Sequence, residues 1–153
     1  MASLQASAQF GRASTDKKTF SRTTTNSQTI NADPSVIWAL LINAADYPRW
    51  NSTIVSIEGK INKGEKIRLK STLDEKRTFK LKVKAFVPNQ KLVWGDGMSE
   101  RVYKLQPQDD QVLFSMTEKI GSFMFPLFAN KIPSFDDSFE QFTADLKKEA
   151  EAK

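Results

Sequence analysis

Polar and apolar residues alternate along much of the chain, and the alternation has a period of two. In residues 77–87, for example, Phe79, Leu81 and Val83 are separated by lysines. This period is typical of β-strands that bury one face. Together with the Thr-rich stretch after Phe20, it predicts strands at 20–30, 52–61, 66–73, 77–87, 91–95, 100–106 and 111–120. Turn residues separate most of these ranges at short intervals, which favours antiparallel neighbours.

The end of the chain changes to the helical period. Apolar residues recur there at spacings of three and four, which predicts an amphipathic helix from 135 to about 151. They are Phe135, Phe139, Phe142 and Leu146. Ser134 and Asp137 stand at the spacing of a capping box at its start.

Two shorter helices are expected between the first and second strands. Asp33 is a good N-cap and Pro34 a good first helical residue, so an apolar helix is predicted to continue through 36–42. Residues 44–50 have the composition of a second short helix, interrupted by a proline.

These elements predict an α+β protein with the helix-grip architecture. A phenylalanine-rich stripe on one helix needs a partner surface, and a curved antiparallel sheet of about seven strands wrapped around the C-terminal helix supplies it. We expect one such domain over 18–153. Residues 1–17 are polar and weakly hydrophobic, which predicts a disordered N-terminal tail.

Several short runs of sequence resemble a known superfamily. They are Asp-Pro-Ser-Val-Ile-Trp at 33–38, Tyr-Pro-Arg-Trp-Asn at 47–51, Lys-Leu-Val-Trp-Gly at 91–95 and the run 100–107. In order and spacing they are similar to the SRPBCC, or START-like, superfamily, in particular its polyketide cyclase/dehydrase and lipid-transport branch, over about 18–151. The resemblance implies a helix-grip fold with a cavity for a hydrophobic ligand. Members often carry His where this chain has Arg101, so the role of that imidazole does not transfer.

Two residue types are absent from the chain, cysteine and histidine. Their absence excludes disulfides, thiolate zinc sites, Ser-His-Asp triads and imidazole bases. We therefore expect no metal and no cofactor, and we assign no catalytic residue. The chain has no apolar run of about 18 residues and no secretory h-region, which predicts a cytoplasmic protein without a transmembrane segment.

The inward-facing residues of the predicted sheet and helix form the candidate ligand-binding wall. The alternative is that they simply pack as a core. The candidates are Trp38, Ile67, Leu69, Phe79, Leu81, Trp94, Arg101, Tyr103, Phe114, Met116, Glu118, Phe135, Phe139 and Phe142. Phenylalanines at 123, 125 and 128 lie on the loop before the last helix, where they would act as a lid or as a plug.

Arg101 and Glu118 are the polar residues expected on the inner face. If the last two strands pair through a turn at 107–110, Arg101 falls opposite Met116 and next to Glu118. A buried pair would anchor the polar end of a ligand, with Tyr103 beside it. The alternative is a solvent-exposed pair at the end of the sheet that contributes little to stability.

The outer face of the third and fourth predicted strands is basic, and the net charge of the chain is +5. The basic residues are Lys66, Arg68, Lys70, Lys80, Lys82 and Lys84. This face predicts either a weak contact with an anionic partner or a solvated surface that resists aggregation. Specific nucleic-acid binding is not expected, because no aromatic residues alternate with the charges.

The leading prediction is a protein, non-enzymatic or without an assigned reaction, that binds a hydrophobic lipid- or polyketide-like molecule between sheet and C-terminal helix. One alternative is an enzyme of the cyclase or dehydrase type that uses Glu118, Arg101 or Tyr103 in place of histidine. The other is a protein-interaction module like the co-chaperones that share this fold.

Overall fold

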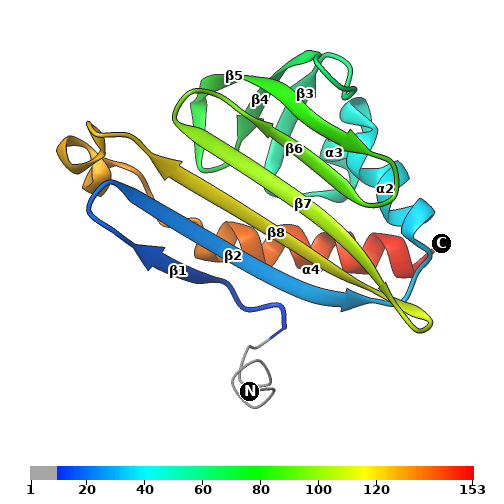
Figure 1. Cartoon of the computed structure of the whole chain (residues 1–153). Coiled ribbons are helices and arrows are strands. Elements are labelled where there is room, and N and C mark those ends of the chain that lie inside the picture. Colours follow the sequence, from blue (N-terminus) through cyan, green and yellow to red (C-terminus); the bar gives the residue numbers. More distant parts are fainter. Residues whose placement is uncertain (1–9) are drawn as a thin grey trace.

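The computed structural model describes residues 10–153, and in them eight antiparallel strands form one curved sheet (Figure 1). The order across the sheet is β1-β2-β8-β7-β6-β5-β4-β3. The strands are β1 (Ser14–Lys17), β2 (Ser21–Ile30), β3 (Ile54–Glu58), β4 (Lys66–Ser71), β5 (Asp74–Val87), β6 (Lys91–Gly95), β7 (Ser99–Gln108) and β8 (Gln111–Gly121). From β3 onwards each strand pairs with the next in the chain, as the short turns predicted.

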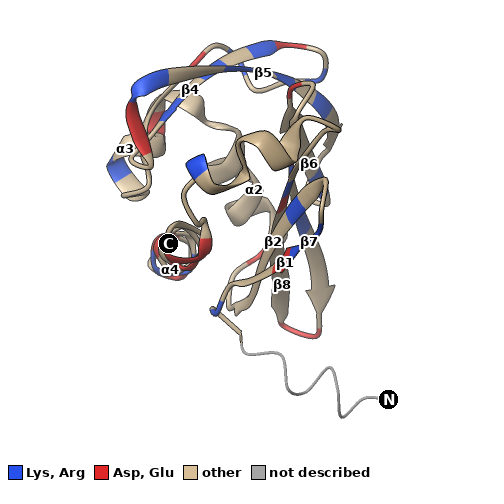
Figure 2. Cartoon of the chain, turned by 90° about the vertical axis from the view of Figure 1, so that its left-hand side faces the viewer, with Lys and Arg blue, Asp and Glu red and all other residues tan. Residues whose placement is uncertain are grey.

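The helices lie on the concave side of the sheet. The long helix α4 (Asp136–Glu151) runs along β2 and β8. Between β2 and β3 the chain forms α2 (Pro34–Ile42), a 3₁₀ turn (Ala44–Asp46) and α3 (Tyr47–Trp50). Viewed along α4, the sheet bends around α2 and α4 (Figure 2). The predicted helix-grip architecture is therefore confirmed.

The N-terminal boundary of the fold differs from the prediction. Residues 14–17 were expected in a disordered tail, but they form the edge strand β1 and pair with β2 over the register Ser14↔Thr25 to Lys17↔Arg22. The Thr15 hydroxyl also hydrogen-bonds to Asp136 at the start of α4. Backbone pairing and polar contacts hold this strand in place, so its sequence lacks the apolar alternation that would predict a strand. Of the rest of the predicted tail, residues 10–13 precede β1, and residues 1–9 lie outside the described residues.

The β7–β8 register is shifted by two residues from the prediction. Strand pairing extends to Gln108↔Gln111, which leaves only Asp109 and Asp110 in the turn, with Asp109 in the left-handed region at φ 54°. The longer hairpin places Arg101 opposite Glu118, and Met116 opposite Tyr103. The two charged residues are therefore direct cross-strand neighbours.

Helix capping also differs from the prediction at both sites. Asp33 occupies the N-cap of α2, but its side chain makes no capping hydrogen bond. The helix α4 begins one residue later than expected, with Phe135 at its N-cap, so the predicted capping box does not form. Instead, the backbone N–H of Asp136 donates to the hydroxyl of Ser134 at 3.2 Å.

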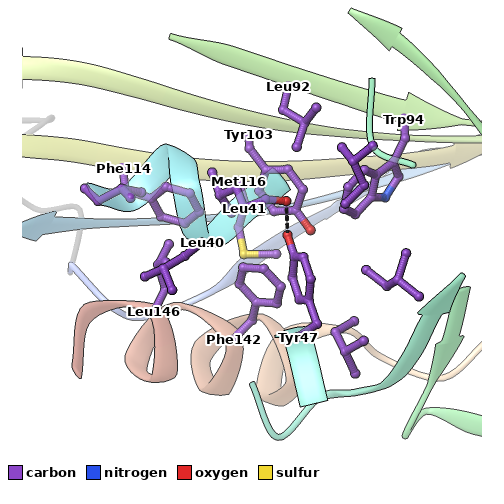
Figure 3. Packing of buried hydrophobic residues seen from close by; sticks show 14 of the residues in the cluster. Leu40, Leu41, Tyr47, Leu92, Trp94, Tyr103, Phe114, Met116, Phe142 and Leu146 are labelled. Atoms are coloured by element: carbon purple, nitrogen blue, oxygen red, sulfur yellow. Dashed lines mark hydrogen bonds between the residues drawn. The ribbon is translucent and has the colours of Figure 1, made fainter. Parts of the chain in front are cut away.

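The middle of the space between sheet and helix is filled with side chains (Figure 3). The Tyr103 ring stacks on Phe142 of α4, with ring centroids 5.4 Å apart. The helices α2 and α3 close the same layer, since the Tyr47 hydroxyl, buried in the core, donates to the carbonyl of Leu41 at 2.7 Å. Phe114 also stacks on Tyr103, with ring centroids 6.0 Å apart. Any cavity must therefore lie away from this centre.

An ion-pair cluster connects α3 to α4. Arg49 donates to Asp46 at 2.8 Å and to Glu149 of α4 at 3.0 Å. These hydrogen bonds from Arg49 lower the pKa of both carboxyl groups. A carboxyl whose pKa is lower in the folded state stabilises the fold above its unfolded pKa, and this stabilisation is lost as the pH falls through the folded value.

We expect Arg49→Ala to lower the free energy of unfolding at neutral pH and to have a smaller effect below about pH 3, where carboxyl groups become protonated. Urea unfolding of both proteins at several pH values measures this difference. Lys104→Ala, on the outer face of β7, serves as a control and should show no such trend. An Arg49→Ala effect that is constant from neutral to acid pH would contradict the assignment.

Candidate functional site

A cavity of about 210 Å³ lies at one end of the space between sheet and helix, near the start of α4. The inner faces of β4 to β8 form one side, and residues 131–135 form the other. The lining residues are Leu69, Ser71, Leu73, Asp74, Arg77, Phe79, Leu81, Trp94, Gly95, Asp96, Met98, Ser99, Arg101, Glu118, Ile120, Lys131, Ile132, Pro133 and Phe135.

The cavity exists because α4 starts late relative to the sheet. The helix begins at Asp136, so only a loop covers the inner face beyond that point. The alternation in β5 turns Phe79 and Leu81 toward this space, and Trp94 of β6 adds a third large apolar side chain. At the other end of the sheet α2 and α3 supply the side chains that fill the interior.

Arg101 and Glu118 form the polar part of the cavity wall. The Arg101 Nε donates to Glu118 Oε1 at 2.6 Å, and the two side chains are only 13% and 12% exposed. The Arg101 guanidinium also lies 5.0 Å from the centre of the Phe139 ring, at cation–π distance. The geometry is that of a largely buried pair rather than of a pair in solvent.

Tyr103 does not line the cavity itself but extends this polar group, because its hydroxyl accepts a hydrogen bond from Arg101 at 3.4 Å. Burial lowers the pKa of Arg101, but the charge of Glu118, with Tyr103, raises it more, so the pKa lies above its ordinary value and the guanidinium stays charged. Burial raises the pKa of the Tyr103 phenol despite the opposing effect of Arg101. The tyrosine is therefore neutral. These are the three residues of the enzymatic alternative, which stays a prediction.

A second buried arginine fixes the loop that closes the cavity. Arg22 of β2 donates to the carbonyls of Ile132 at 3.2 Å and Pro133 at 2.7 Å, and its guanidinium lies 4.9 Å from the Phe135 ring centre. Burial lowers the pKa of Arg22, partly offset by the charges of Glu118 and Asp136. Sequence analysis missed this residue, because one arginine in a polar strand gives no signal of a tertiary contact.

The structure divides the predicted ligand-binding residues into two groups. Those that line the cavity are Leu69, Phe79, Leu81, Trp94, Arg101, Glu118 and Phe135. Those that do not line it are Trp38, Ile67, Tyr103, Phe114, Met116, Phe139 and Phe142, which belong to the hydrophobic core. Periodicity identifies the inward face of each element, but it gives no information about where along that face the space is filled.

Several lining residues were outside the predicted set. Asp74, Asp96 and Ser99 lie at turns or at strand ends, where alternation gives no direction. The loop phenylalanines have different positions: Phe125 is buried in the core, whereas Phe123 is 82% exposed. Phe125 is not among the residues that line the cavity, so the lid and the plug both stay predictions.

Within residues 10–153, no group of three or more His, Cys, Asp or Glu side chains is arranged to hold a metal ion. None of the helices in this described part of the chain is long and apolar enough to cross a membrane.

Comparison with known proteins shows the relationship of this fold. The family model described as "Activator of Hsp90 ATPase homolog 1-like protein" matches residues 31–151. No curated protein matches the chain. The polyketide cyclase/dehydrase branch named by the resemblance is not confirmed.

Several solved structures share the fold at low sequence identity. A START superfamily protein from Mycobacterium smegmatis has a TM-score of 0.62 and 15% identity, with 85% of this chain and 97% of that chain covered. A protein from Rhodobacter sphaeroides has a TM-score of 0.66 and 18% identity, with 92% of this chain and 99% of that chain covered. The Aha1 dimer from Colwellia psychrerythraea has a TM-score of 0.64 and 18% identity, with 84% of this chain and 96% of that chain covered.

The family match spans most of the chain, and the structural matches agree with the observed sheet and helix. The chain therefore belongs to the family of activator of Hsp90 ATPase homolog 1-like proteins, and it shares its fold with a START superfamily protein.

Proposed function

We propose that this protein binds a small apolar molecule with one polar or acidic end in the cavity beside the start of α4. The observation that carries the proposal is the combination of an apolar wall with one buried polar group, Arg101 with Glu118 and Tyr103. Ligand pockets typically have this composition, in which apolar walls give affinity and a few polar groups fix orientation.

The volume of the cavity limits the size of the ligand. An engineered apolar cavity of about 150 Å³ in another protein holds benzene, whereas sites for drug-sized molecules begin at about 300 Å³. A cavity of about 210 Å³ lies between these values. It suits one or two rings, or the end of a single acyl chain, and a longer ligand would extend past Asp74 and Lys131.

Arg101 has donors left for a ligand. A guanidinium carries five N–H groups, and the hydrogen bonds to Glu118 and Tyr103 use two of them. Hydrogen bonds from a charged donor in a site of low dielectric are stronger than neutral ones. A carboxylate or carbonyl at the buried end of the ligand is therefore the preferred acceptor.

Filling the cavity should weaken ligand binding. Leu81→Trp places a larger ring in the open space, so we expect the fold to be kept while apolar contact with the ligand is lost. A loss of about 60 Å² of buried apolar surface corresponds to about 1.5 kcal/mol, or roughly tenfold weaker binding. Calorimetric titration with naphthoic acid measures the effect. Ser115→Trp, on the outer face of β8, should bind like the unchanged protein; equal affinities for all three proteins would contradict the proposal.

The polar group should select acidic ligands. Replacing both charges, Arg101→Met with Glu118→Leu, removes the ion pair as a unit, and such replacements are often tolerated. We expect about tenfold weaker binding of naphthoic acid, because a charge-assisted hydrogen bond is lost, and unchanged binding of neutral naphthalenemethanol. If the binding of both probes were weakened equally, the ion pair would affect the shape of the cavity and would not select for the charge of the ligand.

A second candidate function is supported by the basic residues of β4 and β5 (blue in Figure 2), which alternate with inward-facing apolar residues and so lie on the outer face. Lys66 lies directly opposite Lys82, and Arg68 opposite Lys80. Like charges in opposite positions destabilise a sheet, so an acidic partner would be favoured on this face. The matched family is described by the activation of Hsp90 ATPase, which makes an Hsp90 chaperone the partner to test.

We expect the protein to raise the ATPase rate of purified Hsp90 and expect Lys80→Glu with Lys82→Glu to remove most of this increase. Lys91→Glu with Lys104→Glu is the matched control, because it reverses another opposed lysine pair on the outer face, between β6 and β7. No stimulation by the unchanged protein, or an equal loss in the control, would contradict this second function. Naphthoic acid binding should survive in both variants.

A further inference from the structure

Most of the exposed large apolar side chains lie in one part of the protein. Seven such residues are exposed among those that the structure describes, and all but Phe10 and Val87 lie on segments that meet at the ends of β2 and β8. We call these five residues the apolar tip: Phe20, Met98, Phe123, Met124 and Leu127. Scattered exposed apolar residues are normal, but a cluster of them marks an interaction site.

Backbone hydrogen bonds hold the three segments of the apolar tip together. The N–H of Gly121 donates to the carbonyl of Met98 at 2.9 Å, and the N–H of Ser122 donates to the carbonyl of Phe20 at 3.1 Å. Figure 1 shows the β1–β2 turn and the loop after β8 side by side.

The loop after β8 is anchored to the protein by a buried side chain. Phe125 is buried, and its ring meets the edge of Phe128 at a centroid distance of 5.7 Å. With Phe125 inside, the flanking Phe123 and Leu127 point outward and are 82% and 68% exposed. The exposure of the apolar tip therefore follows from a fixed loop conformation.

The charge around the apolar tip is positive. Residues 16–22, 96–100 and 119–131 together contain five Lys or Arg residues and three acids, Asp16, Asp96 and Glu100. Four of these cations are exposed: Lys17, Lys18, Lys119 and Lys131. Exposed aromatic and aliphatic side chains bordered by lysines are the combination that binds anionic lipid surfaces. Lysine is depleted at protein–protein interfaces, so this combination favours a lipid surface over a protein partner.

The apolar tip also borders the cavity. Met98 belongs to both, and Lys131, Ile132 and Pro133, which continue the same loop, line the cavity wall. A bilayer that contacts the apolar tip would lie next to this wall, so an apolar molecule would reach the cavity without crossing water.

We propose that the apolar tip docks on the surface of an anionic lipid bilayer and that the cavity takes its ligand from that bilayer. The second half of this proposal rests on the proposed function, and the first half stands without it. Docking combines partial insertion of Phe123 and Leu127 with attraction between the lysines and anionic head groups, so it should weaken as salt is added.

Vesicle sedimentation tests the docking step. We expect the full chain to sediment with vesicles made of equal parts phosphatidylcholine and phosphatidylserine, and much less with phosphatidylcholine alone. Phe123→Ser with Leu127→Ser should weaken the binding about tenfold or more, because two apolar anchors are lost. Both residues are exposed, so the fold should be unaffected, which circular dichroism checks. The matched control is Val87→Ser, which removes an exposed apolar side chain from the far end of β5.

The outcomes separate docking from ligand binding. Weaker vesicle binding by the double variant, with Val87→Ser unchanged and naphthoic acid binding intact in both, supports the docking step. Docking is overturned if the unchanged protein does not sediment with the vesicles, or if Val87→Ser loses as much vesicle binding as the double variant. It is also overturned if analytical ultracentrifugation shows a dimer that the double variant abolishes, since the apolar tip would then be a protein interface. Vesicle binding without any naphthoic acid binding leaves the docking surface but removes the cavity as the ligand's destination.

Discussion

The fold depends on the contact between the aromatic stripe of α4 and the concave face of the sheet. Phe142 stacks on Tyr103 of β7, and Tyr103 in turn stacks on Phe114 of β8. Each aromatic pair adds about 1 kcal/mol beyond the burial of its surface, and the three side chains are fully buried. Because these rings occupy the centre of the molecule, the sheet cannot pack closer to α4. The remaining space lies next to residues 131–135, before the helix begins.

This constraint explains how much of the fold could be predicted from the sequence. The alternation in β5 and the helical period of α4 are local signals, and both elements were found close to their observed bounds. The edge strand β1 was missed because polar residues and backbone pairing hold it. The β7–β8 register was wrong by two residues because a two-residue turn with Asp109 at positive φ leaves little trace in a sequence of acids and glutamines.

The candidate site was only half predictable for a related reason. The alternation of inward and outward residues along each strand assigns Leu81 and Trp94 to the inner face, and both line the cavity. Parity assigns Tyr103 to the same face, yet it is core, because Phe142 covers it. Which inward residue meets a side chain and which meets open space depends on where α4 begins, and that position is set by contacts such as those from Arg22 to the loop at Ile132 and Pro133. These contacts join residues more than a hundred positions apart and have no local sequence signal.

The alternation in β5 links the cavity wall to the basic face. Phe79 and Leu81 face the cavity, while Lys80 and Lys82 face outward opposite Arg68 and Lys66. A slip of one residue would exchange the two faces, bringing lysines into the apolar space at a large cost in desolvation. The apolar wall therefore fixes the register, and that register in turn forces the like charges into opposition. The repulsion on the outer face is therefore a consequence of the apolar inner face, and the proposed acidic partner would relieve it on β4 and β5.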